Sequence, residues 1–405
     1  MSTATVGLSF ADRTMDSTAF SMAGLVGAYF GCRVCITFLF FQTDPQAGAV
    51  VSFVLNLLLL VPVAFYAAGP GSMRLRDSLR VWPFRLVLAF LGLSLVSLLW
   101  SEAQSVSIAL GYWTAMAADV ALVLLLLHAE PASRGLHSLM KGYVAGVCVL
   151  ALVAWASPAM ADLRLGDNEF LNPNAIGFEC AFGALFCQYL ASSGARWKWT
   201  GAVLAITLVR SLSKTSIIAF VLVECFYLSR SRTVARGTKI AIAGAGMLVT
   251  AIFWGLFSAY YVVYTNAGTE AETLSGRIGI WLTTLGMALE KPWLGHGLHS
   301  FRAVVPAFGV FEAWHAHNEL LQQFFTYGIV GVVLVMALYG SLFMQARRVA
   351  AKEPLGLLTR ALLLLVVIRG LTDTERFDLS FPLWAITAIS LSLAQMHPLR
   401  REVAS

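Results

Sequence analysis

Charged residues are scarce in this sequence. The chain has 405 residues, of which 12% are charged and 58% are hydrophobic. Soluble domains carry roughly twice that share of charge. Apolar runs of about 17 to 25 residues recur along the whole chain, which is enough for helices that span a hydrocarbon core of ~30 Å. The sequence therefore predicts an all-α polytopic membrane protein, and it lacks the alternating pattern of an outer-membrane barrel.

Several functional signatures are also missing. The 6 cysteines fall inside apolar runs, with neither zinc spacing nor a disulfide framework. The first apolar run follows no basic region and no small-residue cleavage site, so we expect it to remain as an anchor. The sequence has no glycine-rich phosphate loop and no nucleotide motif. Because carboxylates are few in the predicted external loops, we expect no metal and no cofactor.

About twelve apolar runs qualify as membrane spans. They cover residues 20–41, 48–68, 84–100, 106–127, 141–157, 175–193, 198–212, 214–229, 238–263, 318–345, 357–371 and 381–397. Basic residues gather in alternate loops, and the positive-inside rule then places those loops and both termini in the cytoplasm. The net charge of +6 is mostly this topology signal, so we expect no nucleic-acid partner.

The predicted topology divides the single membrane domain into three parts. Residues 1–263 would hold the first nine spans, and residues 318–405 the last three. Between them, residues 264–317 form one long external connection, and a loop of this length is usually functional. Apolar residues from Ile278 to Leu289 recur there at helical spacing. A helix of this length reaches only ~22 Å, so we expect a short amphipathic helix at the membrane surface.

Histidine marks the end of this connection. His317 lies at the mouth of the tenth run, and Asn318 is a plausible N-cap for that helix. The positive end of a helix disfavours imidazolium, so His317 is a candidate general base. On a helix, His315 would point about 200° away from His317, which predicts that the two do not form one pair of metal ligands. Interface-seeking polar residues are the plain alternative.

Two cations occupy unusual positions at predicted external helix starts. Arg277 opens the surface helix, and Lys214 follows Ser213 at the start of the eighth run. A cation opposes the helix dipole at that end unless an anion lies between them, and this combination suits a phosphate. Snorkelling to lipid head groups is the alternative. Arg210 ends the seventh run, where the dipole favours a cation, and it adds to the same field.

Other external polar residues have simpler explanations. Arg164 is a weaker candidate for binding an anion, and capping explains Asn174 before the sixth run. Arg369 lies near the external end of the eleventh run, close in sequence to Asp373 and Glu375. For these three residues a local salt-bridge cluster is the predicted arrangement.

These residues resemble the O-antigen ligase and O-antigen polymerase superfamily of bacterial envelope glycosyltransferases. As in that family, His317-Asn318 is followed by nine residues and then by Gly328-x-x-Gly331. The other family-like elements are Asn172-Pro173-Asn174, Ser275-Gly276-Arg277 with Trp281, and the run from Pro292 to Gly297 with Phe301. The family often has Ser-Arg where this chain has Ser213-Lys214, which keeps the charge but loses the bidentate fork.

The resemblance implies a function at the periplasmic face of the bacterial inner membrane. The donor would be a glycan on undecaprenyl pyrophosphate, and for a ligase the acceptor would be lipid A–core. His317 would deprotonate the acceptor hydroxyl, while Arg277, Lys214 and Arg210 would hold the departing pyrophosphate without a metal. Trp281 would support binding of sugar or lipid. A polymerase of the same superfamily is the main alternative, and a transporter of lipid-linked glycans is a third reading.

Overall fold

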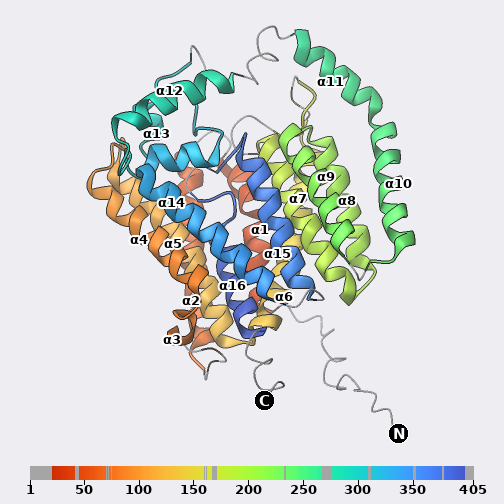
Figure 1. Ribbon diagram of the computed structural model, residues 1–405, viewed down its shortest axis with the longest axis horizontal. Helices are drawn as coiled ribbons and strands as arrows, with labels where there is room; N and C mark the ends of the chain where they lie inside the picture. The colour runs from red at the N-terminus through yellow and green to blue at the C-terminus, as the bar shows by residue number, and fades with distance from the viewer. Residues whose placement is uncertain are drawn as a thin grey trace.

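The computed structural model describes residues 21–41, 45–69, 71, 73, 75–158, 160, 162–166, 171–231, 234–266, 276–308, 312–349, 353–375 and 378–396. These residues form helices and no β-strand (Figure 1). The helices are α1 (Met22–Phe41), α2 (Pro45–Ala67), α3 (Leu75–Ser78), α4 (Trp82–Val96), η2 (Ser97–Leu99), α5 (Val106–Ala129), α6 (Ala132–Ala156), α7 (Pro173–Leu190), η3 (Ala191–Ser193), α8 (Arg196–Arg210), α9 (Lys214–Arg230), α10 (Arg236–Ile252), α11 (Trp254–Asn266), α12 (Arg277–Glu290), α13 (Phe301–Val304), α14 (Glu319–Arg348), α15 (Pro354–Gly370) and α16 (Leu383–Met396).

The all-α prediction is confirmed for the described residues. Every predicted apolar run coincides with a helix, except that the run 238–263 is divided into α10 and α11, which bend by 52°. By length and composition 5 helical segments qualify as membrane spans, or 6 if the bent pair counts as one. The 5 segments are Trp82–Leu99, Val106–Ala129, Ala132–Ala156, Pro173–Ser193 and Glu319–Arg348. The count of about twelve crossings stays a prediction.

Glycines allow the first helix to lie directly against α6. A Cβ added at Gly27 would come within 2.1 Å of the Leu139 carbonyl oxygen, and one at Gly142 within 1.9 Å of the Gly24 carbonyl oxygen. Small residues of this kind let apolar helices approach until their backbones touch. The α1–α6 pair therefore forms a tight centre around which the other helices pack.

The helix after His317 is not straight, although the sequence predicts one uninterrupted span over 318–345. Gly328 has φ 64° and ψ −160°, and it kinks α14 after its first turns. A Cβ at Gly328 would lie 2.3 Å from the carbonyl carbon of Trp293, and the Ile329 amide donates to the Pro292 carbonyl oxygen at 2.8 Å. The missing side chain of Gly328 therefore leaves room for the turn that precedes Gly297. This contact brings the two glycine-bearing motifs together in the structure.

Residues 276–308, which include α12 and α13, form a cap over one end of the bundle. Figure 1 shows α12 and α13 at that end, beside the first half of α14. A separate small core joins them, with Ile280 of α12, Phe301 of α13 and Phe325 of α14 all buried. The predicted helix at Arg277 is thereby confirmed as α12, while its place at a membrane surface stays a prediction.

A polar contact fastens the same cap to the turn between α4 and α5. His296 is 2% exposed, and its Nδ1 lies 2.6 Å from Glu102 Oε2. Lys291 pairs with the same carboxylate. Hydrogen bonds from Lys291 and His296 hold the pKa of Glu102 below its usual range, so this carboxylate is ionised at neutral pH. The cap and the bundle are thus joined by charge as well as by apolar packing.

Candidate functional site

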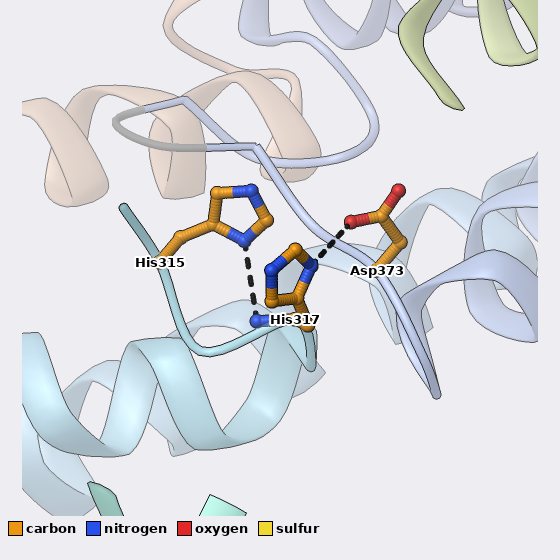
Figure 2. A group of neighbouring side chains, drawn as sticks. All are labelled: His315, His317 and Asp373. Carbon is orange, nitrogen blue, oxygen red and sulfur yellow. Dashed lines mark hydrogen bonds and ion pairs between the residues drawn. The ribbon is translucent and has the colours of Figure 1, made fainter. Parts of the chain in front are cut away.

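His317 and Asp373 face each other at the capped end of the bundle (Figure 2). His317 Nδ1 lies 3.2 Å from Asp373 Oδ1. The side chain of His317 is 18% exposed, whereas that of Asp373 is 5% exposed. An ionised carboxylate only accepts hydrogen bonds, so the proton of a neutral His317 belongs on Nδ1 and leaves a lone pair on Nε2. A base oriented by a carboxylate in this way is the geometry of an activated nucleophile site.

His315 joins this pair, and the expectation that the two histidines point apart was wrong. Helix α14 begins only at Glu319, and His317 adopts a left-handed backbone with φ 51°. The His317 amide donates to His315 Nδ1 at 3.2 Å, and the two ring centroids lie 4.1 Å apart. A helical periodicity does not apply to this turn, so the turn brings both imidazoles to one side.

Three consecutive residues tie the start of α14 to the segment that carries Asp373. His317 bonds to Asp373, and Asn318 Nδ2 donates to the Leu371 carbonyl oxygen at 2.9 Å. The Asn318 side chain also accepts from the Leu321 amide at 3.0 Å, which confirms the predicted N-cap. Glu319 then reaches the same segment from the first position of the helix. The relative positions of the two segments are therefore fixed by side chains on both sides of His317.

Glu319 is the buried member of this set, with 4% exposure. Its Oε2 accepts from the Thr374 hydroxyl at 3.2 Å and from the Ser380 amide at 3.1 Å. The Thr374 amide in turn donates to Asp373 Oδ1 at 3.1 Å. A buried carboxylate is stable only when such donors compensate for its lost hydration. Glu319 thus holds the residue next to Asp373 without facing the open side of the site.

Arg369 controls the charge of Asp373. Burial alone would raise the pKa of Asp373, but the Arg369 guanidinium and the bond from His317 outweigh it and hold that pKa well below its usual range. Arg369 Nη2 lies 3.5 Å from Asp373 Oδ2 and 3.0 Å from Glu375 Oε1. The predicted salt-bridge cluster is confirmed, and it keeps an anion beside His317.

Lys214 is linked to the segment that carries Asp373 through its neighbour Thr215, and its own Nζ lies 5.6 Å from the Tyr260 ring centroid on α11. It opens α9, and the hydroxyl of the next residue, Thr215, lies 2.7 Å from that of Thr372. Thr372 is the residue before Asp373. On the other side of Lys214, the Ser213 hydroxyl donates to Asn174 Oδ1 at 3.1 Å. The structure therefore brings Lys214 and Asn174 to the same end as the histidines.

Arg210 and Arg164 meet at a neighbouring loop. Arg210 Nη1 donates to the Leu163 carbonyl oxygen at 2.8 Å, and its guanidinium carbon lies 6.0 Å from the Trp155 ring centroid. Arg164 Nε is paired with Asp162 Oδ2 at 2.5 Å. Both cations thus have protein partners, which gives them a structural role whether or not an anion binds nearby.

Arg277 and Trp281 share the first turns of α12. Arg277 is the first residue of the helix and follows Gly276, which has φ 78°. Ser275 lies outside the described residues. Trp281 is partly buried, and its indole N–H has no hydrogen-bond partner among the described residues. Because α12 packs against α14, both residues belong to the cap that lies over the histidine end.

The histidine cluster also has the spacing of a metal-binding group. One ligand atom from each of His315, His317 and Asp373 lies within 4.8 Å of the others. Asp373 is already paired with the buried Arg369, however, and a dication would have to be placed beside that guanidinium. Like charges so close together are costly in a low-dielectric site. The donor set therefore fits a hydrogen-bonded dyad better than a resident metal.

Sequence reasoning missed two residues of this site. Asp373 was assigned only to the Arg369 cluster, and Glu319 was given no role. The contact between the start of α14 and the segment after α15 spans 56 residues in sequence, and no local periodicity reveals it. The sequence contains one signal: an acidic residue at each of two predicted external helix ends, Glu319 and Asp373. That signal alone does not show that the two helix ends meet.

Comparison with known proteins shows which part of this chain is similar to a known family. The sequence model of the family described as O-antigen ligase matches residues 199–336. That region contains Lys214, Arg277 and His317, whereas Asp373 lies beyond it. The match confirms the resemblance to the O-antigen ligase superfamily, which consists of glycosyltransferase-type enzymes.

An individual relative gives the same result. The protein described as O-antigen ligase in Pseudomonas aeruginosa is 32% identical to this chain over 117 residues. The aligned part covers 29% of this chain and 28% of that relative, so the similarity spans less than a third of either protein. The two matches show that part of this chain is similar to O-antigen ligases, and the apolar helices suggest a membrane protein.

Proposed function

We propose that this protein is an O-antigen ligase, which transfers a glycan from undecaprenyl pyrophosphate to a sugar hydroxyl of lipid A–core. The observation that carries the proposal is the His317–Asp373 dyad, with Lys214 joined to it through the Thr215–Thr372 contact. A base and a cation at one site are what this transfer needs, because the acceptor loses a proton while the leaving group gains negative charge.

The reaction is a single in-line displacement. The acceptor hydroxyl oxygen attacks the anomeric carbon of the donor, and the bond from that carbon to the phosphate oxygen breaks. His317 Nε2 takes the hydroxyl proton, and the Asp373 carboxylate stabilises the imidazolium that forms. Attack opposite to the leaving group inverts the anomeric configuration. The products are the extended lipid A–core and undecaprenyl pyrophosphate.

Cations rather than a metal neutralise the departing pyrophosphate. Lys214 and Arg277 each lie at a helix start, where backbone amides add to the positive field. Arg210 lies one turn before Lys214 and strengthens the same field. His315 and Asn318 position His317, and Asn174 positions Ser213, the residue before Lys214. Trp281 and Arg164 support substrate binding at the rim.

The orientation follows from the charge pattern of the loops. We place the protein in the bacterial inner membrane with about twelve crossings, both termini in the cytoplasm and the His317 end in the periplasm. ATP is absent from that compartment, so the energy for transfer must come from the pyrophosphate linkage of the donor. Lipid-anchored substrates then reach the site from the membrane itself.

A polymerase is the second candidate, because the motifs are shared by the superfamily. It would transfer the growing chain to another lipid-linked repeat instead of lipid A–core. A transporter is less well supported, because it needs ionisable residues along a path through the bilayer. The residues discussed here gather at one end of the bundle instead.

Lipopolysaccharide from cells lacking this chain separates the two enzymes. For a ligase, the gel shows bare core while long polymer accumulates on undecaprenyl pyrophosphate. For a polymerase, the core carries a single repeat and no ladder. A normal ladder would contradict both. Complementation with His317→Ala, at matched expression, should fail for either enzyme and succeed for a transporter.

A further inference from the structure

We propose that Arg302, Glu312 and Trp314 form a binding surface for a sugar ring of the acceptor glycan. This proposal of an acceptor platform rests on the proposed transfer reaction, and it places the acceptor, one of the two substrates of that reaction, at these three residues. Its residues come from α13 and from the segment that leads into His317, and they are joined to one another by contacts that leave polar and aromatic groups partly exposed.

Arg302 contacts both other residues of the platform. The Arg302 guanidinium carbon lies 3.8 Å from the Trp314 ring centroid. The same guanidinium forks onto Glu312, with Nε 3.2 Å from Oε1 and Nη2 2.5 Å from Oε2. The side chains of Arg302 and Glu312 are 39% and 44% exposed. The bond from Arg302 holds the pKa of Glu312 below its usual range, so the pair is ionised at neutral pH.

A second aromatic pair extends the surface toward α5. The rings of His299 and Tyr112 are stacked at 5.0 Å with an interplanar angle of 23°. Burial and the nearby Arg302 lower the pKa of His299, so this imidazole is neutral and able to accept or donate a hydrogen bond. His299 adopts φ 67°, an uncommon backbone for a residue of this size, which aims it at Tyr112.

This combination suits a carbohydrate. A pyranose has an apolar face of C–H groups, which stacks on aromatic rings, and an edge of hydroxyls, which pair with charged forks. Trp314 precedes His317 by three residues, so an extended chain separates them by at most about 10 Å. One or two sugar units cover that distance. A ring bound at Trp314 therefore presents its own hydroxyl, or that of the next unit, to His317 Nε2.

The position of the platform favours the acceptor over the donor. In the view of Figure 2 the His317 ring lies between His315 and Asp373, and one ligand atom of each residue lies within 4.8 Å of the others. Lys214, which we assign to the pyrophosphate, reaches the site through Thr215 and Thr372 on the Asp373 side. Trp314 is adjacent in sequence to His315, whose Nδ1 accepts from the His317 amide at 3.2 Å. Because His317 deprotonates the acceptor in the proposed reaction, a sugar held three residues from His317 is the acceptor rather than the donor.

Initial rates with purified full-length protein test the assignment. Acceptor and donor are varied separately, with lipid A–core and an undecaprenyl pyrophosphate-linked glycan as the two substrates. We expect Trp314→Ala to raise the acceptor KM about ten-fold, with donor KM unchanged and with Trp314→Phe restoring most of the loss. Trp199→Ala is the matched control, because Trp199 is 77% exposed and lies on α8, away from the cap.

Arg302→Gln provides an independent variant if Trp314→Ala does not fold, and it should also raise the acceptor KM alone. An unchanged acceptor KM in the folded variants, or an equal rise in both KM values, would overturn the platform. If the wild-type protein shows no transfer at all, the proposed function fails instead. Binding of core oligosaccharide to wild type and Arg302→Gln, followed by calorimetry, then still decides whether the surface recognises sugar: weaker binding by the variant supports the platform, and equal binding overturns it.

Discussion

Replacing Asp373 by asparagine removes the charge beside His317 while preserving the shape of the side chain. In the wild type, Oδ1 accepts from His317 Nδ1 at 3.2 Å and from the Thr374 amide at 3.1 Å, while Oδ2 faces Arg369 at 3.5 Å. An amide has only one oxygen. If that oxygen faces Arg369, the amide N–H₂ group meets His317 Nδ1 and favours the tautomer whose Nε2 is already protonated.

The expected loss in kcat follows from the hydrogen bonds that each orientation of the new amide group loses. A hydrogen bond to a charged group contributes about 1.5–3 kcal/mol, which corresponds to roughly 10- to 150-fold in rate. If the tautomer is also reversed, the loss approaches the ~10⁴-fold effect of the equivalent change in a serine protease triad. We therefore expect Asp373→Asn to lower kcat by at least about ten-fold while donor and acceptor KM stay within a factor of about three.

The assay is the initial rate of glycan transfer by purified protein, with Glu375→Gln as the matched control. Glu375 also pairs with Arg369, at 3.0 Å, and within the described part of the chain no hydrogen bond or ion pair joins it to His317. Alanine at 373 is a poorer choice, because it also removes the side-chain oxygens that face the buried Arg369 and the Thr374 amide. A kcat for Asp373→Asn within two-fold of the wild type, in folded protein, would refute the reasoning.

Four further outcomes are expected. Glu319→Gln replaces one of the two carboxylate oxygens that accept from the Ser380 amide and should lower kcat about ten-fold with unchanged KM values, which a purely structural role would not produce. Gly328→Ala should lower the thermal midpoint in detergent, because its Cβ would lie 2.3 Å from Trp293, whereas Gly340→Ala on the same helix meets nothing within 4 Å and should not. Chelation with EDTA should leave transfer unchanged, and activity restored only by an added dication would contradict this. Because the pKa of Asp373 is lowered, its ionised form stabilises the fold above the unfolded value of about 3.9, and that contribution is lost only as pH falls through the lower folded value. The difference in thermal midpoint between wild type and Asp373→Asn should therefore persist from about pH 9 down to about pH 5, and a difference that collapses within that window would be inconsistent with it.

Much of the fold could be predicted from hydrophobic runs alone. A run of apolar residues fixes a helix through local chemistry, so the helical character of every predicted run was found. The kink at Gly328 was not, because it depends on contact with Trp293, which lies 35 residues earlier. The bend between α10 and α11 likewise interrupts a run that is apolar throughout.

The site was predicted in part for the same reason. His317 and Asn318 could be recognised from a helix start and a family spacing, both of which are local. Asp373 and Glu319 could not, because their partners come from distant segments. His315 was misplaced because helical periodicity was applied to a turn, whose left-handed His317 the sequence does not announce.

The central claim is that His317 is the base for glycan transfer by this chain. The most direct measurement is the transfer rate of purified His317→Gln beside wild type, from about pH 5 to pH 9, with unfolding curves as the control for folding. The account predicts robust transfer by the wild type and a loss of about 10²- to 10⁴-fold in kcat for the variant at every pH. Transfer by folded His317→Gln at a rate close to that of the wild type would contradict it.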